Sequence, residues 1–193
     1  MIKSLKISSG WSLFLDRDGV INRRIPDDYV KGPSGFEFLP GVTEALSIFS
    51  EVFRYIVVVT NQQGIGKGLM SVRDLESVHQ KMVGEIENCG GRIDKIYYCP
   101  DLKDSRSFSR KPAVGMGLKA RKDLAGLKLH QSVMAGDTAS DMLFGKRLGM
   151  TTVLISDDVN EIRKCSEMAD FSFPDLISFA RRLKNEGREE GLG

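Results

Sequence analysis

The feature that most constrains the fold is the regular alternation of short apolar runs with longer segments of helical period. The runs are rich in β-branched and aromatic residues without polar alternation, which is typical of parallel strands covered on both faces. Between them, apolar residues such as Leu75, Val78 and Met82 recur at helical spacing. The sequence therefore predicts an α/β fold with a doubly wound parallel sheet flanked by helices. We expect strands at 11–15, 55–59, 93–98, 132–135, 151–155 and 171–173, and helices at 41–53, 72–88, 115–125, 140–148 and 174–185.

Two long segments interrupt this alternation. Residues 20–38 follow the first strand and are predicted to form a small flap, and residues 100–109 form a polar loop after the third strand. Long loops inside a compact domain are usually functional. At 193 residues, the chain suits one domain, which we assign to residues 1–185. Residues 186–193 are charged and glycine-rich, so we expect a disordered tail there.

Charge and cysteine content argue against several classes of protein. The 28 basic and 26 acidic residues give a net charge of +2, too small for nucleic acid to be the main partner, although a small anionic molecule is compatible with it. Three dispersed cysteines favour neither a disulfide framework nor a cysteine-built zinc site. The apolar runs are too short to span a membrane, and residues 1–6 lack the apolar core of a signal peptide. We expect a cytoplasmic monomer or weak homo-oligomer.

Residues able to do chemistry gather where the predicted strands end. Ligands of an open α/β sheet bind beyond the carboxyl ends of its strands. Each polar segment there, taken alone, is ordinary turn or helix-capping chemistry. Their occurrence in order along one edge of one sheet indicates a functional site. The segments are Asp-Arg-Asp-Gly at 16–19, Thr-Asn-Gln at 60–62, Arg-Lys-Pro at 110–112 and Gly-Asp-Thr-Ala-Ser-Asp at 136–141.

These segments resemble the four motifs of the haloacid dehalogenase (HAD) superfamily of phosphohydrolases, which are D-x-D-G, a Thr, a Lys and G-D-x-x-x-D. Longer strings resemble a capless subgroup that contains the D-glycero-D-manno-heptose 1,7-bisphosphate and histidinol-phosphate phosphatases. The strings are FLDRDGVIN from Phe14, VTNQQGIGKG from Val59, IYYCP from Ile96 and RKP from Arg110. The resemblance runs from about residue 14 to about residue 155. It implies a Rossmann-like fold, no large cap domain and magnesium-dependent hydrolysis of a phosphate monoester.

The resemblance also implies a role for each motif residue. Asp16 is the nucleophile that forms an aspartyl-phosphate, and Asp18 is the general acid and base. Thr60 and Lys111 stabilise the phosphoryl oxygens. Mg²⁺ is held by Asp16, the Asp18 backbone carbonyl and Asp137, because hard oxygen ligands suit that ion. Asp141 is expected to orient the metal site or Lys111.

Substrate contacts are expected from residues around this centre. Asn61 and Gln62 follow the motif threonine, and Tyr29 lies at a matching position in the flap. Arg110 matches a substrate-contacting position and can hold a second phosphate. Relatives in the subgroup commonly carry a zinc loop before Arg-Lys-Pro, but residues 100–109 contain neither Cys nor His. We therefore predict no structural zinc.

The favoured substrate is a small phosphorylated sugar, D-glycero-D-manno-heptose 1,7-bisphosphate. Histidinol phosphate is the alternative within the same class of enzyme. From another class, a receiver-like phospho-acceptor module also combines an acidic metal pocket with Thr and Lys on a doubly wound sheet. Such a module keeps its acyl phosphate, whereas a general base at Asp18 favours turnover.

Overall fold

The computed structural model describes residues 7, 8, 10–26 and 28–190. Within them, six strands form one sheet in the order β3-β2-β1-β4-β5-β6, and all neighbouring pairs are parallel. The predicted fold class is therefore confirmed. The strands are β1 (Ser12–Leu15), β2 (Tyr55–Asn61), β3 (Lys95–Cys99), β4 (Ser132–Gly136), β5 (Thr151–Ile155) and β6 (Phe171–Phe173). The helices are α1 (Val42–Val52), α2 (Gln63–Gly66), α3 (Val72–Asn88), α4 (Gly115–Asp123), α5 (Ala139–Arg147), α6 (Val159–Cys165) and α7 (Leu176–Glu190), with 3-10 turns at Pro33–Gly35 and Leu129–Gln131.

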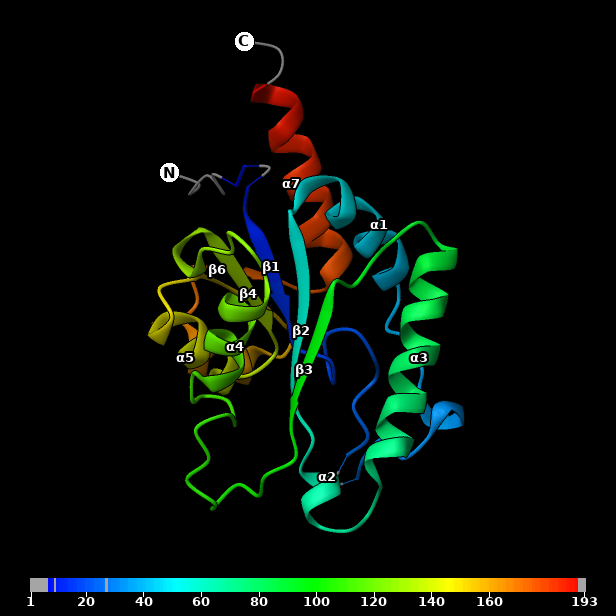
Figure 1. Ribbon diagram of the computed structural model, residues 1–193. Coiled ribbons are helices and arrows are strands. Elements are labelled where there is room, and N and C mark those ends of the chain that lie inside the picture. Colours follow the sequence, from blue (N-terminus) through cyan, green and yellow to red (C-terminus); the bar gives the residue numbers. More distant parts are fainter. Residues whose placement is uncertain (1–6, 9, 27, 191–193) are drawn as a thin grey trace.

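Helices cover both faces of this sheet. In Figure 1, α1, α3 and α7 lie on one side of the strands, and α4 and α5 lie on the other. Side chains alternate between the two faces along a strand. Leu13 and Leu15 therefore join the core under α1 and α7, whereas Phe14 joins the core under α4 and α5. Both faces are buried, which explains why the strand sequences are continuously apolar.

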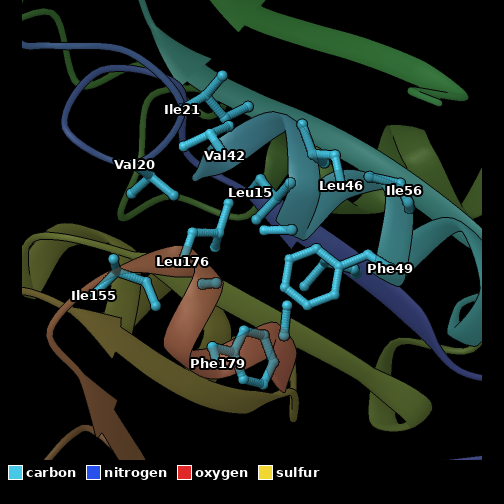
Figure 2. Close-up of a cluster of buried hydrophobic side chains, with 14 of the residues drawn as sticks. Leu15, Val20, Ile21, Val42, Leu46, Phe49, Ile56, Ile155, Leu176 and Phe179 are labelled. Atoms are coloured by element: carbon cyan, nitrogen blue, oxygen red, sulfur yellow. The ribbon is translucent and has the colours of Figure 1, made fainter. Parts of the chain in front are cut away.

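The larger of these cores is built around aromatic residues of α1 and α7. Figure 2 shows Phe49 of α1 and Phe179 of α7 beside Leu15 and Leu176. The rings of Phe49 and Phe179 lie 5.2 Å apart between centroids and are tilted relative to each other. All four side chains are buried. Fully burying one such side chain contributes about 1.5–3 kcal/mol, so this core fixes the two helices against the sheet.

Three helical segments differ from the sequence predictions, and the first is the four-residue helix α2, which no predicted helix covers. The helix α6 was not expected, because its apolar residues form no buried stripe: Val159 is 67% exposed and Ile162 is 37% exposed, and Cys165 is buried. The helix α7 continues to Glu190, so the tail predicted for 186–193 is helical at 186–190. Residues 191–193 lie outside the described part of the chain. None of the helices in the described ranges combines the length and apolar character that a membrane span requires.

The flap, the loop after β3 and the short helix α2 lie beyond the carboxyl ends of the strands (Figure 1). The flap is anchored by Ile21, Val30 and Phe36, which are buried in the larger core. An isolated antiparallel bridge joins Asn22 to Phe38 and closes the base of the flap. Residue 27 of the predicted flap lies outside the described residues. The polar ends of β1, β2 and β4 therefore open toward these three segments.

Candidate active site

The centre of the site is a buried lysine between two carboxylates. Lys111 Nζ lies 2.9 Å from Asp16 Oδ1, just beyond β1, and 2.6 Å from Asp141 Oδ1 in the first turn of α5. The other oxygen of Asp141 accepts hydrogen bonds from the backbone and side chain of Thr138, which cap α5. Burial lowers the pKa of Lys111, but the charges of Asp141 and Asp16 outweigh it and raise that pKa overall. Lys111 is therefore a fixed cation beside Asp16.

Three carboxylates meet at the same point. Ligand oxygens of Asp16, Asp137 and Asp141 all lie within 4.8 Å of one another. Burial raises the pKa of Asp16 to about 6, with Lys111 opposing the shift and Asp141 adding to it. Burial, together with the charges of Asp16 and Asp141, also raises the pKa of Asp137 well above its usual value. A divalent cation bound between Asp16 and Asp137 would favour their ionised forms, because its positive charge offsets the cost of burying the two carboxylates. The cluster can hold a metal ion.

A flap arginine, which the sequence analysis did not single out, already bridges two of the predicted ligands. One terminal nitrogen of Arg24, Nη2, donates to the backbone carbonyl of Asp18 at 3.0 Å and to the carboxylate of Asp137 at 3.0 Å. Gly19, at φ +95°, brings the turn after Asp18 against Asp137, whose carboxylate a Cβ at Gly19 would overlap. The Asp18 carbonyl and Asp137 thus share one cation. No motif spacing marks Arg24, which explains why sequence reasoning missed it.

The side chain of Asp18 is held by donors on three sides. Arg17 Nη2 donates to both carboxylate oxygens at 2.9 Å, Asn22 donates at 3.0 Å and Gln62 at 2.7 Å. Burial alone raises the pKa of Asp18, but the Arg17 charge and these hydrogen bonds outweigh it and lower that pKa. Asp18 is therefore held as a carboxylate. Arg17, also missed by the sequence analysis, is wholly buried and contacts His79 Nε2 at 3.2 Å.

The two predicted substrate residues after Thr60 have their side chains engaged by the protein. Asn61 Nδ2 donates to the Lys111 carbonyl at 3.1 Å, and the Lys111 backbone N–H donates back to Asn61 Oδ1 at 3.0 Å. Gln62 is buried, and its Nε2 donates to Thr60 Oγ1 at 2.9 Å as well as to Asp18. Asn61 therefore positions Lys111. Gln62 positions Thr60 and Asp18 from behind, and it does not line the cavity.

A cavity of about 420 Å³ opens over these groups. Its floor contains the predicted residues Asp16, Asp18, Thr60 and Lys111. The Tyr29 ring packs so closely on Gly64 of α2 that a Cβ there would lie 2.8 Å from the ring. The flap is therefore seated against α2 over the cavity. The cavity is also lined by Arg24, Ile25, Asp28, Tyr29, Val30, Asn61, Gln63, Lys67, Arg110, Thr138, Ser140 and Asp141.

Comparisons with known proteins show which family this chain belongs to. The HAD-hydrolase-like family model matches residues 108–178. A D-glycero-alpha-D-manno-heptose-1,7-bisphosphate 7-phosphatase from Mycobacterium bovis is 35% identical over 181 residues, which cover 94% of this chain and 95% of the relative. A 7-phosphatase of the beta anomer from Vibrio cholerae is 36% identical over 151 residues, covering 75% of this chain and 80% of that relative.

The crystal structure of a D,D-heptose 1,7-bisphosphate phosphatase from B. bronchiseptica, complexed with magnesium and phosphate, superposes with a TM-score of 0.81. The two chains are 28% identical, and the match covers 91% of this chain and 99% of the other. The fold is that of a HAD-like phosphatase. Within that class, the chain belongs to the family of D-glycero-D-manno-heptose-1,7-bisphosphate 7-phosphatases. The alternative of a receiver-like signalling module is therefore set aside.

Proposed function

We propose that this chain removes the 7-phosphate of D-glycero-D-manno-heptose 1,7-bisphosphate through an aspartyl-phosphate on Asp16. The relatives that cover nearly the whole chain carry this activity in their names. The observation that carries the proposal is the buried Asp16–Lys111–Asp141 ion-pair group beside the Asp137 carboxylate. A phosphate monoester dianion repels a carboxylate, so attack requires positive charge fixed at this point.

One carboxylate oxygen of Asp16 is held by contacts within the protein, and the other is available for attack. Asp16 Oδ1 contacts Lys111 Nζ and accepts the Arg17 backbone N–H at 2.7 Å. Oδ2 then attacks phosphorus, and the bond between phosphorus and the sugar oxygen breaks. Lys111 and the Thr60 hydroxyl face the phosphoryl oxygens from the cavity floor. Asn61 keeps Lys111 in register through its paired backbone hydrogen bonds.

Asp18 transfers the proton in both halves of the reaction. The charge of a bound phosphate dianion raises the pKa of Asp18, which favours its protonated form when the sugar oxygen leaves. Asp18 gives its proton to that oxygen. Once the sugar has departed, Arg17 favours the carboxylate again. In this form Asp18 takes a proton from the water that hydrolyses the aspartyl-phosphate.

Mg²⁺ is the proposed cofactor. Asp16, Asp137 and the Asp18 carbonyl would hold it, and when bound it supplies positive charge that reduces repulsion between Asp16 and the phosphate. Asp141 is proposed to orient Lys111, which it contacts at 2.6 Å, while its other oxygen accepts from Thr138. We propose no structural zinc, and metal analysis of the purified protein tests this.

The cavity suits a small phosphorylated sugar. Its volume lies within the usual range for small-molecule sites, and the proposed substrate contacts Arg110 and Tyr29 line it. A phosphate-release panel with Mg²⁺ tests the proposal, using both anomers of the heptose bisphosphate, histidinol phosphate and p-nitrophenyl phosphate. We expect fastest turnover on a heptose bisphosphate, with the 1-phosphate retained in the ³¹P NMR spectrum of the product, and no turnover in Asp16→Asn. Faster release from histidinol phosphate would overturn the proposed substrate.

A further inference from the structure

A second hollow adjoins the catalytic cavity on the side of the loop after β3. Its volume is about 510 Å³. Arg110, Lys111, Asn61 and Ser140 line both the hollow and the cavity, so the two are adjacent. A ligand in the cavity therefore lies next to the hollow.

Every charged residue that lines the hollow is basic. Besides Lys111, these residues are Lys103 and Arg106 in the loop after β3, Arg110, and Arg147 at the end of α5, and the lining contains no Asp or Glu. None of these four side chains takes part in an ion pair within the described ranges 7–8, 10–26 and 28–190. Cationic side chains that lie close together without carboxylate partners repel one another. An anion bound between them removes that repulsion.

Backbone contacts aim two of these cations without neutralising them. Arg147 Nη1 donates to the carbonyl of Pro112 at 2.9 Å, and Arg110 Nη1 donates to the carbonyl of Asp101 at 3.0 Å. Pro112 directly follows Lys111, so Arg147 is tied to the segment that carries the catalytic lysine. A guanidinium whose other N–H groups remain available suits a phosphate, which it can bind with two parallel hydrogen bonds.

We infer that Lys103, Arg106 and Arg147 extend the Arg110 position into a second anion subsite, which binds the phosphate that is not hydrolysed. The inference rests on the proposed function, because it assigns a place to the second phosphate of a bisphosphorylated sugar. One phosphate is attacked by Asp16 while the other remains bound in the hollow. The enzyme should then prefer bisphosphorylated over monophosphorylated forms of the same sugar.

The test compares two substrates in variants of the magnesium-loaded enzyme. Arg147→Gln and Arg106→Gln remove charge from the subsite, and Lys146→Gln is the matched control on α5, because Lys146 pairs with Asp170 outside the hollow. The measured quantity is the kcat/KM for the heptose 1,7-bisphosphate divided by that for the heptose 7-phosphate. We expect this ratio to fall roughly tenfold in each subsite variant, mainly through KM for the bisphosphate, since one charge-assisted contact is lost. Lys146→Gln should keep the wild-type ratio.

Two outcomes separate this inference from the proposed function. An unchanged ratio in Arg147→Gln, Arg106→Gln and their double variant would overturn the subsite while leaving the heptose activity in place. If wild-type enzyme turns over another sugar phosphate instead, the proposed substrate has failed. The same ratio is then measured with the bisphosphorylated and monophosphorylated forms of that sugar, and a loss of preference in the variants still supports the subsite.

Discussion

Replacing Asp16, the proposed nucleophile, with asparagine should stabilise the metal-free protein at neutral pH while abolishing activity. Burial is the main reason that the pKa of Asp16 rises from its ordinary 3.8 to about 6, and the Asp141 charge adds to it against the opposing effect of Lys111. Each pKa unit corresponds to about 1.4 kcal/mol, so ionised Asp16 lowers the free energy of unfolding by about 3 kcal/mol. Asparagine keeps the shape of the side chain and removes its charge.

The size of this effect depends on pH in a defined direction. Below pH 3.8 the Asp16 carboxyl is protonated in both folded and unfolded protein, and its charge costs nothing. Between pH 3.8 and 6 the folded protein keeps a proton that the unfolded chain releases, so the free energy of unfolding contributed by this group falls as pH rises. Above pH 6 the ionised Asp16 carboxylate lowers the free energy of unfolding by its full amount. The advantage of Asp16→Asn should therefore be about 3 kcal/mol at pH 8 and roughly half of that at pH 5.

Urea unfolding in EDTA at these two pH values measures the prediction. Asp170→Asn is the control with the opposite sign: burial raises the pKa of Asp170, but hydrogen bonds from Lys146 and Thr152 outweigh it and lower that pKa. Its removal should destabilise the protein. Adding Mg²⁺ should stabilise wild type more than Asp16→Asn, because the variant lacks a ligand. A variant at Asp16 that is no more stable than wild type at pH 8 in EDTA would refute the reasoning.

Three further changes test the groups around the nucleophile. Arg24→Gln removes the cation bound to Asp137, so isothermal titration calorimetry should show Mg²⁺ binding about fivefold tighter, and weaker binding would contradict competition at that carboxylate. Lys111→Met should lower kcat roughly 10²–10³-fold in phosphate-release assays, and a loss below tenfold would argue against a catalytic charge. Gly136→Ala would place a Cβ against the Asp141 side chain. We expect the free energy of unfolding, measured with urea, to fall by about 1–3 kcal/mol and kcat to be reduced. An unchanged urea midpoint would show that this segment moves freely to accept the methyl group.

The amino-acid pattern alone predicts the parallel sheet and the polar residues at its edge. Continuous β-branched runs predict strands buried on both faces, and parallel strands bring their carboxyl ends to one side. Asp16 after β1 and Asp137 after β4 therefore had to lie on the same rim, since β1 and β4 are neighbours. The helix α6 escaped prediction because a short helix with exposed Val159 and Ile162 leaves no periodic signal.

The contacts of the remaining polar side chains depend on packing between distant parts of the chain. Arg24 reaches Asp137 across 113 positions of sequence, and Asn61 pairs with Lys111 across 50. Arg147 joins the basic hollow from a different helix than the loop that forms its other wall. No local pattern encodes such contacts. Spacing along the chain specifies which face of a helix or strand a residue occupies. The direction of a long polar side chain depends instead on the neighbours that tertiary packing brings to it.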